Sequence, residues 1–160
     1  MKIKIFALTH KKFEVPQDKM YQPLQVGREE KEDLGYLCDN TGDNISAENC
    51  YYSELTGLYW IWKNVHTYKY VGTCHYRRYL LNEQEKIFTE AEYLELLKDY
   101  DLITTKRVVL NNSYHYGFAT NHNIHALDMT GEVIKELYPE YYDTFVQLVN
   151  GTETYFGNMI

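Results

Sequence analysis

The sequence predicts an α/β fold with a mostly parallel central sheet and helices on both of its faces. The main observation is alternation, because runs of β-branched and aromatic residues take turns with helix-like apolar patterns along the chain. One such run, Tyr70-Val71-Gly72-Thr73-Cys74, has the composition of a strand that is covered on both faces. A length of 160 residues and an apolar fraction of 44% are sufficient for one buried core. We therefore expect residues 1–160 to form a single domain.

The first expected strand covers residues 2–8 and ends in the polar, basic segment Thr9-His10-Lys11-Lys12. The prolines at positions 16 and 23 predict that a loop follows this strand. The charged run 28–33 in this loop is interpreted as a solvent-exposed face.

The middle of the chain is expected to hold a short strand, a helix and a longer strand. The short strand covers residues 35–37 and leads into the turn-rich segment CDNTGDNIS. Residues 53–65 are predicted to be an amphipathic helix, because apolar residues recur there at helical spacing: Leu55, Leu58, Tyr59, Trp62 and Val65. The strand at 70–74 follows, and it runs directly into the basic sequence His75-Tyr76-Arg77-Arg78.

The rest of the chain is expected to continue the alternation. Thr89 and Glu92 have the spacing of a capping box, which predicts a helix that runs to about residue 99. Residues 101–104 are predicted to be a strand. A further helix is indicated by Ile124, Leu127, Ile134 and Leu137, and a last helix begins near Pro139 and ends at Asn150-Gly151. The terminal segment TYFGNMI is interpreted as the start of a strand.

Composition limits the partners of the protein. The net charge of −7 argues against a protein that binds nucleic acid, so an anion site must be made by a few basic residues in a cleft. The 17 tyrosines would suit a site for sugars, but each of them is equally compatible with a half-buried position in the core. Cys38, Cys50 and Cys74 lack paired spacing and indicate free thiols. The N-terminal apolar run is too short for a signal peptide or a membrane span, so we expect a cytoplasmic protein.

Basic residues gather at the ends of the expected strands, where ligands bind in parallel sheets. They occur in the segments 9–11, 75–78 and 104–107. We expect these segments to converge on one anion, because the arginine fork donates two parallel hydrogen bonds to phosphate oxygens. The alternative is that Arg77 and Arg78 form ion pairs with local acids, namely Asp39, Asp43 or Glu54.

Acidic residues and histidines offer further interpretations. Asp39, Asp43 and Glu54 are candidates for a general base. The two aspartates could equally form Asx turns, and Glu54 could simply favour the start of a helix. The histidines at positions 115, 122 and 125 suggest a metal site, but no cysteine or acidic ligand stands at a diagnostic spacing. We therefore expect no metal site.

Several separate segments together resemble one known family. They are IFALTHKKFEVP, QVGREE, DNTGDNIS, YYSELTGLYWIWKN, YVGTCHYRRYL and YFGNMI. The family is one of bacterial capsular or exopolysaccharide biosynthesis proteins, of the domain-of-unknown-function type. It is regarded as a group of glycosyltransferases with a GT-A-like, Rossmann-like fold. The resemblance covers essentially the whole chain. Family members continue past the final motif, so the chain is expected to be truncated at the C-terminus.

The resemblance implies a nucleotide-sugar site. GT-A enzymes usually bind the donor diphosphate through a metal held by an Asp-x-Asp motif, and the sequence CHYRR is similar in position but lacks that motif. The expectation is that arginines supply the charge and that no cofactor is required, with a divalent metal disfavoured. The resemblance assigns donor binding to Thr9, His10, Lys11, Asn44, Ser46, His75, Arg77, Arg78 and Asn158.

The expected function is transfer of a hexose from a nucleotide sugar, with UDP the favoured nucleotide, to a growing capsular, exopolysaccharide or O-antigen glycan. The leading alternative is a non-catalytic domain that binds a nucleotide or a protein partner. A metal-dependent hydrolase built on the histidines is a distant third. Peripheral association with a polysaccharide assembly machinery is expected, as is self-association, because an apparent strand ends the chain. His75 and Arg77 share a face in extended geometry, so we expect both to point to the diphosphate.

Overall fold

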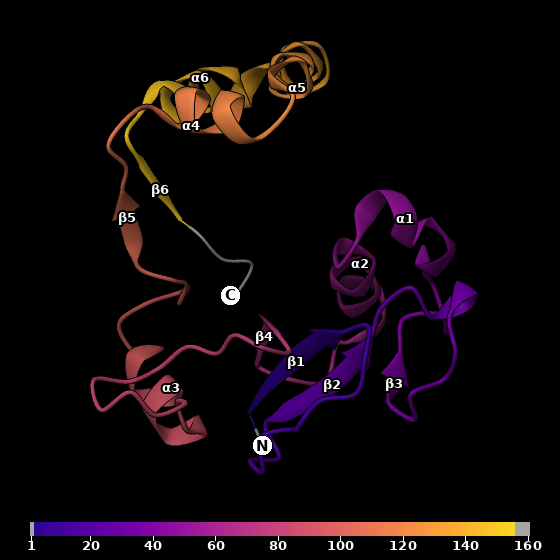
Figure 1. Ribbon diagram of the computed structural model, residues 1–160. Helices are drawn as coiled ribbons and strands as arrows, with labels where there is room; N and C mark the ends of the chain where they lie inside the picture. The colour runs from indigo at the N-terminus through magenta and orange to yellow at the C-terminus, as the bar shows by residue number, and fades with distance from the viewer. Residues whose placement is uncertain (1, 156–160) are drawn as a thin grey trace. The chain divides into compact units, whose positions relative to one another are not determined.

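The computed structural model describes residues 2–155 (Figure 1). The chain separates into a first compact unit that ends at Thr104 and a second that begins at Thr105. That the whole chain acts as one domain stays a prediction.

A four-stranded sheet forms the centre of the first unit. The strand order is β3-β2-β1-β4, and every neighbouring pair is parallel. The strands are β1 (Ile3–Thr9), β2 (Tyr21–Gln25), β3 (Leu37–Cys38) and β4 (Tyr70–His75). This arrangement confirms the predicted parallel sheet.

Helices cover both faces of this sheet, as predicted. Along β1 the odd-numbered residues, such as Ile5, join a core cluster that includes Tyr93 of helix α3 (Glu90–Leu96). The even-numbered Phe6 and Leu8 join a second cluster with Trp60 of helix α2 (Leu55–Asn64). Because successive side chains of a strand point to opposite faces, the two helices lie on opposite sides of β1.

The strand β2 contradicts the prediction of a loop around Pro23. The backbone N–H groups of Ile5 and Val26 donate to the carbonyls of Met20 and Thr9, so the even-numbered residues of this segment bond to β1. Pro23 therefore faces the other edge, where pairing with β3 begins only at Leu24. A proline is tolerated there because its missing N–H has no partner to lose.

The helix predicted for residues 53–65 is confirmed by α2, and a separate short helix precedes it. Helix α1 (Asn49–Tyr52) ends at Ser53, whose positive φ of 50° interrupts the helical path before α2 starts. The capping box of α3 is confirmed, with the Thr89 N–H donating to Glu92 Oε2 at 2.8 Å. Two short 3₁₀ turns, Arg28–Glu30 (η1) and Ser46–Glu48 (η2), lie in the loops beside β2 and α1.

The strand predicted at residues 101–104 is wrong. This segment is irregular, and Ile103 packs against the first core cluster without pairing in a sheet. Strand β5 (Arg107–Val109) comes later and pairs antiparallel with β6 (Glu153–Tyr155), both in the second unit. The remainder of the expected C-terminal strand, 156–160, lies outside the described residues.

Helices make up most of the second unit. They are α4 (Tyr114–Asn121), α5 (Ile124–Leu137), the 3₁₀ turn η3 (Pro139–Tyr141) and α6 (Tyr142–Asn150). Helix α5 forms as predicted although it contains Gly131. A Cβ at this position would lie 2.8 Å from the ring of Phe145 in α6. Glycine thus permits the close approach of two helices. Helix α4 was not predicted, since its apolar residues do not follow a clear helical stripe.

None of the helices in residues 2–155 has the length and apolar character needed to cross a membrane.

Candidate anion-binding cleft

A cleft of about 330 Å³ opens where three parallel strands end. In the sheet, Leu8 lies opposite His75 and Thr9 lies opposite Gln25, so the residues that follow β1, β2 and β4 are close neighbours. The cleft is lined by Leu8, Thr9, His10, Val26, Lys31, Asn49, Ser53, Glu54 and His75. Four of the predicted site residues, Thr9, His10, Glu54 and His75, therefore lie in one cleft.

A turn after β1 places His10 at the cleft. The buried hydroxyl of Thr9 donates to the carbonyl of Lys11 at 2.6 Å and accepts from the Lys11 N–H at 3.1 Å. This local bonding pattern is one that Ser and Thr offer at turns. It leaves His10 and Lys11 exposed at the end of the strand.

The chain also turns directly after β4. The N–H of Arg78 donates to the carbonyl of His75 at 2.9 Å, and the N–H of Arg77 donates to His75 Nδ1 at 3.4 Å. The strand has therefore ended before the two arginines, and their side chains do not follow the simple alternation of a strand.

The buried ring of Tyr76 brings the basic groups of both strand ends together. Lys11 Nζ lies 5.4 Å from the ring centroid and Arg77 Cζ lies 5.0 Å from it. The His10 ring meets Tyr76 edge-on at 5.5 Å, and His75 lies at 4.4 Å. Cations are attracted to the face of an aromatic ring at these distances. Sequence reasoning did not single out Tyr76, although its place between two basic residues was a signal.

The basic groups affect one another's ionisation. Burial lowers the pKa of His10 below its usual value of 6.5, and the positive charges of Lys11, Lys31 and Arg77 lower it further. A single environment thus contains four groups that repel additional positive charge. An anion is the natural counterion for such a group.

The pKa of His75 is lowered mainly by burial. The carboxylate of Glu54 opposes this effect, whereas Arg77, Arg78 and His10 add to it. Glu54 therefore lies close enough to His75 to act on its charge, and both line the cleft.

Neither Arg77 nor Arg78 forms an ion pair with a carboxylate within residues 2–155. The alternative pairing with Asp39, Asp43 or Glu54 is thus not seen in this part of the chain. Both arginines are exposed and available to an external anion.

Asp39 lies outside the cleft, in a buried polar network. Its carboxylate is fully buried, and the N–H groups of Gly27 and Arg28 donate to it at 2.8 and 3.1 Å. The hydroxyls of Ser46 and Thr56 donate to it at 2.6 Å each. Two carboxylate oxygens have about four acceptor sites, and these donors occupy them. This arrangement favours a structural task for Asp39, which joins the loop after β2 to η2 and α2.

The predicted residues Asp43 and Asn44 lie in the turn before η2. Asp43 accepts a hydrogen bond from the hydroxyl of Tyr59 at 3.0 Å, which raises the pKa of Tyr59. The side chain of Asn44 donates to the Gly42 carbonyl and accepts from the Ser46 N–H. These contacts are those of an Asx-type turn. Neither residue lines the cleft.

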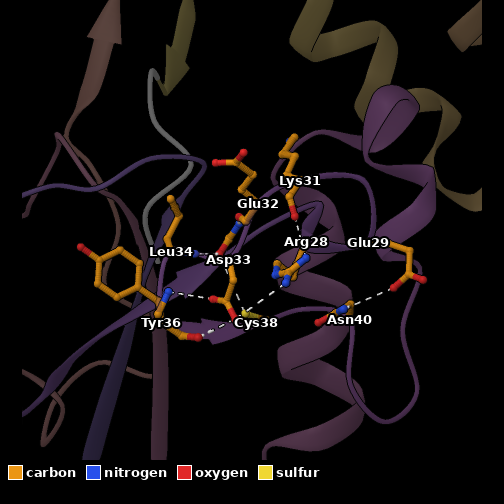
Figure 2. A network of polar contacts seen from close by, with 11 residues as sticks. Arg28, Glu29, Lys31, Glu32, Asp33, Leu34, Tyr36, Cys38 and Asn40 are labelled. Carbon is orange, nitrogen blue, oxygen red and sulfur yellow. Dashed lines mark hydrogen bonds and ion pairs between the residues drawn. The ribbon is translucent and has the colours of Figure 1, made fainter.

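The charged run 28–33 is largely exposed, as predicted, and several of its side chains also make local polar contacts (Figure 2). The Arg28 guanidinium donates to the carbonyl of Lys31 at 2.6 Å and lies 3.7 Å from Asp33 Oδ2. Glu29 accepts from the amide of Asn40 at 3.3 Å. The side chain of Lys31 instead contacts Asn49, and both residues line the cleft. Sequence reasoning missed this pair.

Residues 105–107 of the other predicted basic segment lie in the second unit, as do the histidines at positions 115, 122 and 125. Arg107 pairs there with Glu153 at 2.9 Å. His115 Nε2 lies 3.8 Å from Asp128 Oδ1, and the centroids of the tilted His122 and Phe118 rings are 4.8 Å apart. Within residues 2–155, no group of three or more His, Cys, Asp or Glu side chains could hold a metal ion. The predicted donor residue Asn158 lies outside the described residues.

Comparisons with known proteins agree with this architecture. A family model described as "Domain of unknown function (DUF4422)" matches residues 4–160. The chain is also similar to the apo structure of WbbM, a bifunctional glycosyltransferase, with 29% sequence identity and a TM-score of 0.84. That match covers 99% of this chain and 33% of the WbbM chain. The chain therefore has a glycosyltransferase fold and spans about a third of the length of that protein. A search of curated proteins finds no match.

Proposed function

The chain belongs to the DUF4422 family, and we propose that it is a glycosyltransferase domain that binds a nucleotide sugar in the cleft at the ends of β1 and β4. The observation that carries this proposal is the group of basic side chains, including His10 and Arg77, that surrounds the Tyr76 ring. Arg77 forms no ion pair with an acidic side chain among residues 2–155. The similarity to a bifunctional glycosyltransferase over nearly the whole chain supports the same activity.

The proposed reaction moves a hexose from a UDP-sugar to a hydroxyl of a growing capsular, exopolysaccharide or O-antigen glycan. The acceptor oxygen forms a bond to the anomeric carbon while the bond from that carbon to the β-phosphate oxygen breaks. The electron pair leaves with the diphosphate, whose negative charge grows at that moment. Cations next to the leaving oxygen stabilise this state more than the ground state, and they thereby lower the barrier.

Arg77, Arg78, His10, Lys11 and His75 are proposed to bind the diphosphate without a required metal. A metal would ordinarily supply this positive charge, but the segment 75–78 offers arginines in place of acidic ligands. Thr9 shapes the turn that carries His10 and Lys11. Asn44, Ser46 and Asn158 remain proposed contacts to the nucleotide or sugar.

Glu54 is proposed as the base that takes the proton of the acceptor hydroxyl. Of the three acidic candidates, Asp39, Asp43 and Glu54, only Glu54 is among the lining residues of the cleft. The four hydrogen bonds to Asp39 leave it little capacity to accept a further proton donor.

The activity test uses the full 160-residue chain with UDP-hexoses. Slow release of UDP in the absence of acceptor, and loss of that release in Glu54→Gln with UDP binding retained, are expected. Binding of UDP without any turnover would favour the alternative of a non-catalytic binding domain. Absence of stabilisation by any nucleoside diphosphate or its sugar in a thermal-shift screen would refute both versions.

The same proposal includes a cytoplasmic location, a glycan acceptor, self-association and peripheral contact with a polysaccharide assembly machinery. Size-exclusion chromatography with light scattering tests the self-association. A monomer at micromolar concentration would contradict it.

A further inference from the structure

We propose that Lys31 is a phosphate-binding residue of the cleft and that Asn49 is the residue that positions it. This inference rests on the proposed function for the identity of the ligand, a nucleoside diphosphate. The contacts that carry it lie entirely within the first unit. They begin at the buried Asp39 and end at the Lys31 ammonium group.

The chain of contacts has three links. The Thr56 hydroxyl donates to Asp39 Oδ2 at 2.6 Å. Asn49 Nδ2 donates to Thr56 Oγ1 at 3.2 Å and to the carbonyl of Ser53 at 2.6 Å. Lys31 Nζ then donates to Asn49 Oδ1 at 2.6 Å.

Chemistry determines the direction of each hydrogen bond. A carboxylate that receives four donors acts as an acceptor, so the single hydroxyl hydrogen of Thr56 points to Asp39. The Thr56 oxygen and the Ser53 carbonyl are therefore left as acceptors, and both N–H bonds of Asn49 are used on them. The Asn49 carbonyl oxygen must then face Lys31. The buried aspartate thus determines which end of the Asn49 amide receives the lysine.

Gly27 packs directly against the side chain of Asn49. Its φ of 65° lies in the left-handed region, and a Cβ at this position would overlap the side chain of Asn49. Only a residue without a side chain allows the loop after β2 to pass so close. The same loop is anchored to Asp39 through the N–H of Gly27.

The hydrogen-bond partner of Lys31 is neutral, and within residues 2–155 its ammonium group forms no ion pair. Neighbouring acids are directed elsewhere, with Asp33 near Arg28 and Glu29 near Asn40 (Figure 2). Lys31 and His10 line the same cleft, and the positive charge of Lys31 is among the lesser causes that lower the pKa of His10, after burial. An ammonium group has three N–H donors, and one of them is used on Asn49. The other two are available to phosphate oxygens.

The test compares Lys31→Met, Asn49→Ala and the double variant by calorimetry, with UDP and with inorganic pyrophosphate as probes. Lys31→Met is expected to weaken the binding of both probes by roughly tenfold or more, as for a hydrogen bond to a charged group. Asn49→Ala is expected to weaken binding several-fold. The double variant should bind no more weakly than Lys31→Met alone, because the positioning residue has nothing left to position. Lys31→Arg should recover part of the affinity, and Lys86→Met, on an exposed lysine outside the cleft, should change nothing.

Each other outcome decides against a particular claim. Unchanged UDP affinity in Lys31→Met refutes the role of Lys31 and leaves the proposed function intact. Additive effects of Lys31→Met and Asn49→Ala refute positioning by Asn49. Binding of pyrophosphate that depends on Lys31, without binding of UDP or its sugars, refutes the proposed function and supports the phosphate site. A wild-type chain that binds neither probe refutes both.

Discussion

Two loops at the same edge of the sheet contain charged residues that are treated in opposite ways. The loop after β3 holds Asp39, whose buried carboxylate accepts four hydrogen bonds from its own chain. The loop after β4 holds Arg77 and Arg78, which are exposed and form no ion pair within residues 2–155. The carboxylate of Asp39 is satisfied by hydrogen bonds inside the fold, and the two guanidinium groups are available to a ligand.

The contrast separates structural charges from ligand-binding charges. A buried charge is tolerated only when its hydrogen-bonding capacity is filled, and removing a partner leaves unsatisfied groups behind. Exposed like charges that gather around one ring, such as Lys11 and Arg77 at Tyr76, are destabilised until an anion arrives. The first loop should therefore govern stability, and the second should govern affinity.

The largest expected effect is on the first loop. Asp39→Ala should lower the free energy of unfolding by about 3–5 kcal/mol, because four donors lose a buried acceptor. Urea denaturation followed by circular dichroism measures it. A loss below about 1 kcal/mol would show that the network is not structural.

Arg77→Ala should affect binding and leave folding nearly unchanged. We expect UDP affinity to fall by about 1.5–3 kcal/mol, the range for a hydrogen bond to a charged group. Arg77→Lys should recover only part, because lysine lacks the bidentate fork. Arg78→Ala should have a smaller effect, since the guanidinium of Arg77 lies 5.0 Å from the Tyr76 ring, beside the other basic groups.

Calorimetry in EDTA tests the same comparison without a metal. Binding to the wild-type chain should survive the chelator. Strict dependence on manganese, or equal affinity for UDP in Arg77→Ala, Arg78→Ala and the wild type, would contradict the proposal that the loop after β4 binds the diphosphate without a metal.

A smaller effect is expected from pH. The pKa values of His10 and His75 are lowered below 6.5, so both rings are neutral at pH 8 and become charged as the pH falls through their lowered pKa values. A bound diphosphate favours the charged form, so UDP affinity should rise from pH 8 to pH 6 with uptake of protons. Calorimetry in buffers of different ionisation enthalpy measures this uptake.

The unliganded protein should respond in the opposite sense. Because the folded-state pKa of each histidine lies below its unfolded value of 6.5, its stabilising contribution is present above that pH. It is lost as the pH falls through the lowered folded value. Thermal unfolding of His10→Gln and the wild type across pH 5 to 8 checks this sign. A UDP affinity that falls at lower pH would contradict the role of the histidines.

The smallest expected effect is at Asp43, an exposed acid close in sequence to Asp39. Its side chain accepts a hydrogen bond from the hydroxyl of Tyr59. Asp43→Asn should change the free energy of unfolding by no more than about 0.5 kcal/mol, as is usual for surface positions. A loss of unfolding free energy as large as that of Asp39→Ala would contradict the view that Asp39 is structural and Asp43 is not.

The elements that depend on residues close together in the sequence were predictable. The strands β1 and β4, the capping box of Thr89 and Glu92 and the helix α5 depend on side-chain periodicity and on groups a few residues apart. The gathering of Thr9, His10 and His75 followed from the rule that parallel strands end at one edge. Strand β2 was missed because a proline is acceptable only where a neighbouring strand has not yet begun to pair, which a single sequence does not reveal.

The sequence by itself determined the α/β alternation and which strand ends carry basic residues. Only the tertiary structure decided which charges stay available, because that depends on partners far apart along the chain. The carboxylate of Asp39 accepts hydrogen bonds from residues as far apart in the sequence as Gly27 and Thr56. The ammonium group of Lys31 donates to the neutral side chain of Asn49 and not to an acid. The sequence alone does not tell whether a given carboxylate or ammonium group is buried in a hydrogen-bond network or faces a cleft. Burial and hydrogen bonding, which arise when distant segments pack, assign one to stability and the other to binding.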